Sequence, residues 1–448
     1  MNRETQGIIP LYVFQYGGIH YAIDIEKMQA NVVDDLTAEY PGRVSPELER
    51  PLPSDPEENL KKKKQERTSI ITMALFVTRA CNLQCSYCYE KKINNSMEEK
   101  TAFQAVDWLL RQSGDMKKIY ISFFGGEPFL NFPLIKKVAA YAREAAGNLD
   151  KTVGFSVTTN ATLLNDETIS FLREYDVNVL VSMDGPREIH DKQRPFADGH
   201  GSYDTIMPRV KKLLEVKPDT CAHAVLVDDS KSELVKSSLK NIGFREVTLL
   251  PASPSLFEEE KKTGKVKHAR KLDGLLRELE RETELWLKLV KNRDKESLKD
   301  LRSRAQLSQA LLSLLHNKKL RYACGAGIKF IAVSCEGDIY LCHRFVGLEN
   351  YKLGNIFKTG LKENYRESPL TRVPSCAACF ARYYCAGGCK HDNAGSCGSA
   401  WTSSEEICRL RRRELELAAV LVSQFNDQDR AFLNEYEIFP PKPCPLDF

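Results

Sequence analysis

Three cysteines in the first quarter of the chain have the spacing of a metal-binding loop. Cys81, Cys85 and Cys88 follow a short apolar run in the order Cys-x-x-x-Cys-x-x-Cys. Thiolates are the usual ligands of iron–sulfur clusters, and three of them can hold three irons of a 4Fe–4S cluster. A structural zinc site would need a fourth ligand, and no fourth cysteine or histidine lies nearby. The spacing therefore predicts a cluster whose fourth iron is open to a ligand.

A second and larger group of cysteines lies between residues 324 and 408. We find no signal peptide in the sequence, so we expect a reducing, cytoplasmic location, where disulfides rarely persist. Clustered cysteines then indicate metal ligands or catalytic thiols. This region is also rich in glycine, and it is expected to be loop-rich and partly stabilised by bound metal. Cys221 and Cys444 stand alone and are expected to be ordinary thiols.

Polar and glycine-containing motifs stand at the ends of three predicted strands. They are Gly125-Gly126-Glu127-Pro128, Thr158-Thr159-Asn160 and Ser182-Met183-Asp184-Gly185. Glycines let a backbone approach a ligand, and Glu127 can accept a hydrogen bond from an ammonium group. Simple turn formation is the alternative for Asn160 and Asp184. Because ligands bind at the carboxyl ends of parallel strands, these motifs and the cysteine loop are expected to meet at one site.

Six β-rich runs alternate with amphipathic segments and would position these motifs. The runs are Met73–Thr78, Ile119–Phe124, Val153–Thr159, Val177–Met183, Ala222–Val227 and Glu246–Pro251. Repeated βαβ units predict a parallel sheet of the α/β class. Six units are too few for a closed eight-stranded barrel, so we expect a partial (β/α)6 barrel with a C-terminal loop-rich domain and a small N-terminal α+β segment.

The remaining regions complete a four-part organisation. Residues 1–65 are expected to form a small N-terminal segment, with strands at 12–16 and 19–23 and a linker at 51–64. Residues 66–255 form the barrel, 256–320 a helical connector with two helices, and 321–448 the cysteine-rich domain and its tail. Lys61 to Lys64 are expected to lie on the solvated linker, with a contact to an acidic leader peptide as the alternative.

Composition narrows the possible partners. The 448 residues are 42% apolar and 28% charged, which fits a globular protein. The net charge of +4 is too small to indicate nucleic-acid binding. No apolar stretch approaches the ~20 residues of a membrane span. We therefore expect neither nucleic acid nor membrane as a partner.

The cysteine loop, with Tyr87 before its last cysteine, closely resembles the signature of the radical S-adenosylmethionine (SAM) superfamily. Gly125, Gly126, Glu127 and Pro128 match that family's GGEP motif. The resemblance implies that SAM chelates the open iron through its amino and carboxylate groups and is cleaved to a 5′-deoxyadenosyl radical. It also implies that Glu127 accepts the methionine ammonium, that Asn160, Ser182 and Asp184 contact SAM, and that Arg194 pairs with its carboxylate.

The late cysteines are similar to the seven-cysteine pattern of the SPASM domain, which implies two auxiliary 4Fe–4S clusters and thus three in all. One would be held by Cys376, Cys379, Cys385 and Cys408, and the other by Cys324, Cys342 and Cys389. The second set lacks a fourth cysteine, because Phe330 stands where fully ligated relatives have one. Cys335 or Cys397 could substitute, but the preferred hypothesis is an open iron that binds a substrate thiolate. Cys335 is also kept as a candidate catalytic residue.

Within this group, the chain resembles maturases that form thioether bonds in ribosomally made polypeptides, namely six-cysteine (ranthipeptide) maturases and quinohemoprotein amine dehydrogenase maturases. Sulfatase maturases carry a catalytic aspartate where this chain has His343, a candidate base that could equally be structural. The expected substrate is a cysteine-containing precursor peptide or small protein subunit, and the expected reductant is a low-potential donor such as flavodoxin or ferredoxin. Formylglycine formation and carbon–carbon cross-linking are the alternatives, and residues 1–65 are a possible peptide-recognition element.

Overall fold

The structure is a computed structural model that describes residues 11–33, 69–227, 231–252, 256, 272–304, 307–358, 360–362, 369–436 and 438. The expected linker at 51–64, the lysine run, Cys444 and the tail from residue 439 lie outside these residues. The described chain forms two compact units. One gathers residues from 1–60, 269–324 and 367–448, and the other residues from 61–268 and 325–366. We call them the three-segment unit and the barrel unit.

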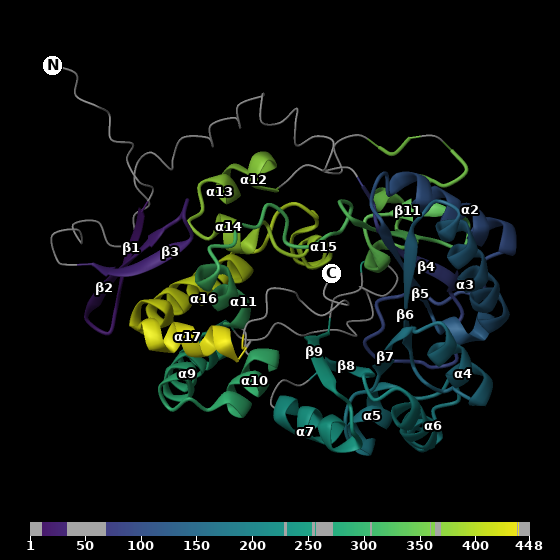
Figure 1. Ribbon diagram of the computed structural model, residues 1–448, viewed down its shortest axis with the longest axis horizontal. Helices are drawn as coiled ribbons and strands as arrows, with labels where there is room; N and C mark the ends of the chain where they lie inside the picture. Colours follow the sequence, from purple (N-terminus) through teal and green to yellow (C-terminus); the bar gives the residue numbers. More distant parts are fainter. Residues whose placement is uncertain are drawn as a thin grey trace. The chain divides into compact units, whose positions relative to one another are not determined.

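The barrel unit is built on a nine-stranded sheet with the order β12-β11-β10-β4-β5-β6-β7-β8-β9 (Figure 1). The strands are β4 Thr72–Thr78, β5 Lys118–Gly125, β6 Thr152–Thr159, β7 Asn178–Ser182, β8 Cys221–Leu226, β9 Glu246–Pro251, β10 Phe330–Val333, β11 Asp338–Tyr340 and β12 Lys352–Asn355. Strands β4 to β9 are all parallel, which confirms the six expected strands and the partial barrel. Strand β10 joins β4 in parallel, and β11 and β12 add antiparallel strands that the sequence pattern did not reveal.

Helices connect the parallel strands and bury their apolar faces against the sheet. They are α2 Glu99–Gln112, η3 Pro128–Asn131, α3 Phe132–Gly147, α4 Asp166–Glu174, α5 Arg187–Gln193, α6 Tyr203–Val216 and α7 Ser232–Ile242, with short turns η5 His343–Phe345 and η6 Glu349–Tyr351. Strand β4 is buried along its whole length, as expected for a central parallel strand covered on both faces. In α4, Asn165 and Thr168 form a reciprocal capping box that fixes the start of the helix.

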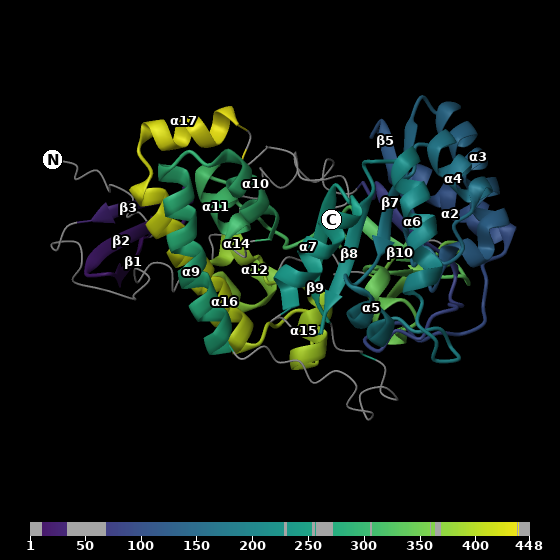
Figure 2. The same cartoon turned by 90° about the horizontal axis from the view of Figure 1, so that it is seen from below.

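The three-segment unit combines an antiparallel sheet with a helical bundle (Figure 2). Its elements are β1 Leu11–Tyr16, β2 Ile19–Asp24, β3 Gln29–Val33, α9 Leu272–Lys291, α10 Lys295–Arg304, α11 Ser308–Leu315, α12 Pro369–Arg372, α13 Pro374–Ala377, α14 Arg382–Cys385, α15 Lys390–Cys397, α16 Glu405–Gln424 and α17 Asp427–Glu435. Where two helices were expected in the connector, its described residues contain three, and a left-handed backbone at Arg293 separates α9 from α10. A third strand, β3, extends the expected hairpin.

The strands β1 to β3 share one apolar core with helices α9, α11 and α16. The Tyr12 ring stacks on Phe380 with centroids 3.5 Å apart, and its hydroxyl donates to Glu416 of α16 at 2.7 Å. Glu26 pairs with the buried Arg382 at 2.7 Å and with Lys319 at 2.6 Å. The first strands of the chain are thus packed against its cysteine-rich part.

Candidate functional site

The cysteine loop leaves the end of β4 and is held directly against the glycines that end β5. The Glu127 amide donates to the Ala80 carbonyl at 2.9 Å, and the Gly126 amide donates to Thr78 at 3.2 Å. A Cβ on Gly126 would lie 2.1 Å from the Ala80 carbonyl oxygen, so only glycine fits here. The two motifs therefore form one local structure, as the sequence predicted from the adjacent strand ends.

The three thiols of this loop are free and partly buried. Burial raises the pKa of Cys81 to about 11 and that of Cys88 to about 12, while the nearby Lys92 ammonium acts in the opposite direction. Such thiols become ligands when a bound cation offsets the cost of their negative charge. The Asn160 amide also lies within 3.9 Å of the Cys81 sulfur. This donor set fits an iron–sulfur cluster.

Glu127 is fully buried and cross-links the ends of β5 and β6. It accepts hydrogen bonds from the Asn160 amide at 2.7 Å, the Thr159 hydroxyl at 2.8 Å and the Phe129 amide at 3.2 Å. Burial raises its pKa to about 7, although these donors act to lower it. A carboxylate offers about four lone-pair sites. Three hydrogen bonds therefore leave one lone-pair site of the carboxylate without a donor among the described residues.

Asn160 ties the end of β6 to the cysteine loop as well. Its side-chain amide donates to the Asn82 carbonyl at 2.9 Å, and its own carbonyl accepts from the Thr162 hydroxyl at 2.6 Å. Asn82 in turn donates to Thr162 at 2.8 Å. This closed ring of amides and hydroxyls fixes Asn160 beside the loop that carries Cys81.

Asp184 and Arg194 form a buried ion pair, which Tyr87 also contacts. Arg194 donates from Nε at 2.9 Å and from Nη2 at 3.0 Å, and Tyr87 donates its hydroxyl to Asp184 at 2.6 Å. Burial alone would raise the pKa of Asp184, but the Arg194 guanidinium and these hydrogen bonds hold it below its usual value. Both residues were predicted to contact SAM. The structure shows that they also bind each other, while Nη1 of Arg194 makes no hydrogen bond within the described residues.

Ser182 ends β7 and pairs in register with His223 of β8. The Nε2 atom of His223 is buried without a hydrogen-bond partner among the described residues. The sequence analysis did not select this residue. A single histidine within a strand forms no motif, so no sequence signal would have identified it.

His343 lies among aromatic rings from two strands and one loop of the barrel unit. Its ring centroid is 4.7 Å from that of Phe124, 5.9 Å from that of Phe330 and 6.4 Å from that of Tyr89. Cys335 is also buried, and its thiol donates to the Phe76 carbonyl at 3.1 Å. Burial raises the pKa of Cys335 to about 12. The geometry gives His343 a defined orientation and gives Cys335 a backbone partner.

The structure brings together the four thiols predicted for one auxiliary cluster. Burial raises the pKa of Cys376 to about 11, and the proximity of Cys379, Cys385 and Cys408 adds to the effect. Burial also raises the pKa of Cys379 and of Cys385, while the charges of Arg412 and Arg382 act in the opposite direction at Cys379 and that of Arg411 does so at Cys385. These thiols and cations fit a cluster with a net negative charge.

The cysteines predicted for the other auxiliary cluster belong to different units. Cys324 and Cys389 lie in the three-segment unit, and Cys342 lies buried in the barrel unit. Among the described residues, no group of three or more histidine, cysteine, aspartate or glutamate side chains could hold a single metal ion.

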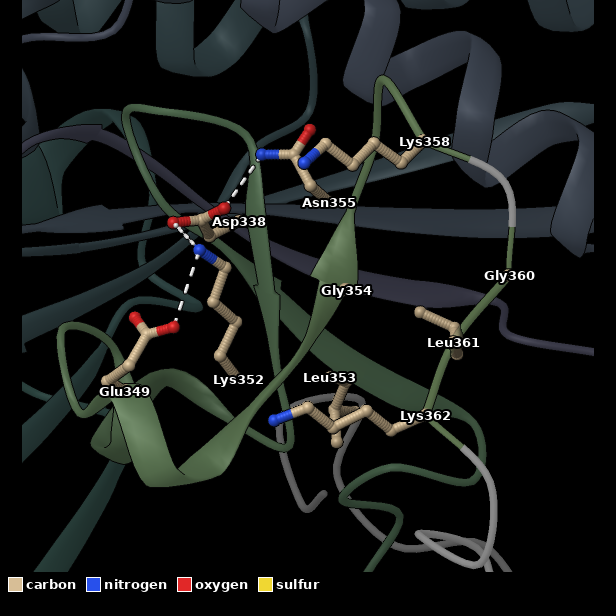
Figure 3. A pocket seen from close by; sticks show the side chains of 10 residues that line it. All are labelled: Asp338, Glu349, Lys352, Leu353, Gly354, Asn355, Lys358, Gly360, Leu361 and Lys362. Carbon is tan, nitrogen blue, oxygen red and sulfur yellow. Dashed lines mark hydrogen bonds and ion pairs between the residues drawn. The ribbon is translucent and has the colours of Figure 1, made fainter.

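A pocket lined by both charged and apolar residues lies at the edge strand β12 (Figure 3). Its lining includes Lys352, which pairs with Asp338 at 2.9 Å and with Glu349 at 3.7 Å. It contains none of the predicted site residues. The chemistry-bearing residues of the barrel unit lie instead at strand ends and on its inner face.

Comparison with known proteins agrees with this geometry. Residues 75–238 match the sequence profile of the radical SAM superfamily. The chain contains a radical SAM domain. It is therefore an enzyme, and such a domain binds SAM on a 4Fe–4S cluster. Within the described residues, every helix falls short of the length and apolar character that a bilayer span demands.

Several proteins resemble parts of this chain. It is 41% identical over 131 residues to the protein MJ0907 of Methanocaldococcus jannaschii, which covers 29% of this chain and 44% of that protein. It is 24% identical over 332 residues to a cysteine-type anaerobic sulfatase-maturating enzyme of Clostridium novyi, covering 70% of this chain and 85% of the relative. A serine-type enzyme of Bacteroides thetaiotaomicron is 26% identical over 341 residues, covering 70% and 80% respectively.

Two solved structures share the fold. The structure of anSMEcpe with bound AdoMet superposes with a TM-score of 0.62 and 22% identity, covering 79% of this chain and 98% of the other. Streptococcus suis SuiB bound to the precursor peptide SuiA has a TM-score of 0.50 and 15% identity, covering 89% and 98%. The similarity therefore extends beyond the radical SAM domain.

Proposed function

We propose that this radical SAM enzyme is a SPASM-type maturase that forms thioether bonds in a ribosomally made peptide or protein. The maturase assignment rests on two groups of cysteines. One group of three lies on the loop after β4, and the other group of four lies in the three-segment unit. Relatives named as sulfatase-maturating enzymes, and the similar fold of SuiB with its precursor peptide, support a polypeptide substrate.

Within the barrel, the protein's own residues would hold and orient SAM. When bound, the cluster and SAM together supply a 5′-deoxyadenosyl radical that removes a hydrogen atom from an unactivated carbon. Glu127 keeps one lone-pair site for an ammonium group. Arg194 is oriented by Asp184 so that its Nη1 remains available to a carboxylate, and a guanidinium suits that partner. Asn160 and Ser182 provide further polar groups at adjacent strand ends.

The proposed reaction breaks one C–H bond and one S–H bond of the substrate and forms one C–S bond. One hydrogen atom leaves in 5′-deoxyadenosine. The other would leave as a proton, taken by a base, and an electron, for which an auxiliary cluster would be the acceptor when bound. We propose Cys376, Cys379, Cys385 and Cys408 as ligands of one auxiliary cluster, and Cys324, Cys342 and Cys389 as ligands of a second cluster with an open iron.

Phe330 and His343 favour thioether formation over formylglycine formation. Phe330 is buried at the position where a fourth cysteine ligand would be expected, and its ring contacts that of His343. His343 occupies the place of the aspartate base expected of sulfatase maturases. Formylglycine formation is the second candidate, because the sulfatase-maturating relatives cover more than two thirds of this chain.

Mass spectrometry of cysteine-containing peptides, treated anaerobically with the cluster-loaded enzyme, SAM and a reductant, tests the proposal. A thioether removes two hydrogen atoms per bridge and leaves the cysteine resistant to alkylation. Formylglycine from cysteine exchanges the thiol for an aldehyde that reacts with hydrazine reagents. The Cys85→Ala enzyme is the control and should leave the peptide unchanged. Hydrazine-reactive product from the wild-type enzyme would establish the second candidate instead.

A further inference from the structure

His223 presents a buried polar atom to the inner face of the barrel. Ala222 and Ala224, its neighbours in β8, are fully buried, so alternation along the strand places His223 on the opposite face. Its register partner on β7 is Ser182. The charged groups that act on its ring are Arg194, Asp184 and Arg344. His223 therefore faces the residues already assigned to the SAM site.

Hydrogen bonds fix the backbone around His223 and so the point from which its side chain leaves the strand. The His223 carbonyl accepts the Met183 amide at 3.0 Å. Two residues further on, the Val225 amide donates to Asp184 at 3.0 Å, and its carbonyl accepts from Gln193 at 3.3 Å. The Nε2 atom is nevertheless buried without a partner in the described residues. Buried polar groups in native proteins are nearly always paired, so this atom calls for a ligand.

The order of the strands indicates which part of SAM would reach the Nε2 atom of His223. The amino-acid half would chelate iron at the loop that follows β4, whereas His223 lies on β8, four strands further along the sheet. Neighbouring strands are about 4.8 Å apart, which places β8 about 19 Å from β4 along the curved sheet. The part of SAM that extends away from the cluster, its nucleoside, is the part that can approach β8.

We propose that His223 binds the nucleoside half of SAM through a hydrogen bond to Nε2, an inference that rests on the proposed radical SAM function. Burial and the Arg194 charge lower the pKa of His223 to about 4, so its ring is neutral near pH 7. A neutral imidazole can accept a hydrogen bond at one nitrogen and donate from the other. It thus suits the hydroxyl and ring-nitrogen groups of a nucleoside.

The test compares SAM binding and stability of cluster-loaded variants by anaerobic calorimetry and thermal unfolding. His223→Phe should weaken SAM binding about three- to tenfold, the equivalent of one neutral hydrogen bond. Its stability without SAM should be unchanged or higher, because the unpaired polar atom is removed. His223→Gln should restore most of the affinity. His200→Phe, at an exposed histidine, is the matched control and should not alter SAM affinity.

Three results would overturn the inference. Unchanged SAM affinity in His223→Phe would exclude the contact. Weaker peptide binding with unchanged SAM binding would assign Nε2 to the substrate. A loss of stability without SAM that parallels the loss of affinity would show a structural role. Failure of the wild-type enzyme itself to bind SAM would instead refute the proposed function, so the two failures are distinguishable.

Discussion

Replacing Arg194 by methionine isolates the contribution of the buried ion pair to the site. Asp184 is almost completely buried and accepts two hydrogen bonds from Arg194, together with others from Tyr87, Gln193 and Val225. Methionine fills a similar volume but removes the charge and both hydrogen bonds. The Asp184 carboxylate then remains buried without a counter-ion. Breaking one side of a buried pair typically costs about 3–5 kcal/mol.

We expect the free energy of unfolding to fall by about 3 kcal/mol, the lower end of this range, because three hydrogen bonds to Asp184 remain. The loss should depend on pH in a definite direction. In the wild type, the pKa of Asp184 is lowered, so its stabilisation is present above the unfolded value of about 3.9 and is lost below the folded value. Without Arg194 the folded pKa is raised. Protonation then relieves the buried charge, and the difference between variant and wild type should shrink from pH 7 toward pH 4.

Urea unfolding of the cluster-free protein at pH 7 and at pH 5, followed by circular dichroism, measures this difference. Arg187→Met is the matched control, because Arg187 pairs with Asp204 at an exposed position and should contribute little. A deficit below about 1 kcal/mol would show that the pair is not the electrostatic centre of the site. A deficit of equal size at both pH values would show that lost packing, rather than the unpaired carboxylate, causes it.

Three further substitutions test other parts of the structure. Gly126→Ala should prevent cluster loading at the cysteine loop, because the added Cβ would meet the Ala80 carbonyl. Iron analysis after reconstitution should show this loss. The control Gly147→Ala, where a Cβ meets open space, should load normally. Tyr12→Ala should destabilise the three-segment unit by about 3–5 kcal/mol, measured by urea unfolding, and an unchanged midpoint would contradict the shared core. Burial lowers the pKa of His190 to about 4. As the pH falls from 6.5 to 4, this group should therefore reduce the free energy of unfolding by up to about 3 kcal/mol. An equal dependence of stability on pH in His190→Gln would refute this.

The sequence predicted the barrel better than it predicted the rest of the fold. The six parallel strands are mostly apolar runs, and β4 is buried along its whole length, so their local signal is strong. Strands β10 to β12 are only three or four residues long and lie among cysteines and glycines, where that signal is weak. The packing of β1 on α16 joins residues 404 positions apart, and no local pattern encodes such a contact.

The functional site was also predicted only in part. The cysteine loop and the GGEP motif could be identified from spacing, because their chemistry demands fixed residue types over a few positions. The ion pair of Asp184 and Arg194 could not, because each residue was matched separately to a ligand. His223 was missed because a single histidine in a strand carries no motif. Only its register with Ser182 and its unpaired nitrogen distinguish it.

The long separation between Tyr12 and Glu416 has a consequence for how the protein is made. A ribosome adds about 5–20 residues per second, so the partner of Tyr12 emerges roughly 20–80 s after Tyr12 itself. During synthesis the barrel strands β4 to β9 can pair before β1 to β3 find α16. The four-thiol group that includes Cys408 is completed late as well. The proposed loading of that group with iron and sulfide therefore cannot be completed before Cys408 has emerged. Nascent chains stalled before α16 would expose the apolar strands β1 to β3 to chaperones and proteases.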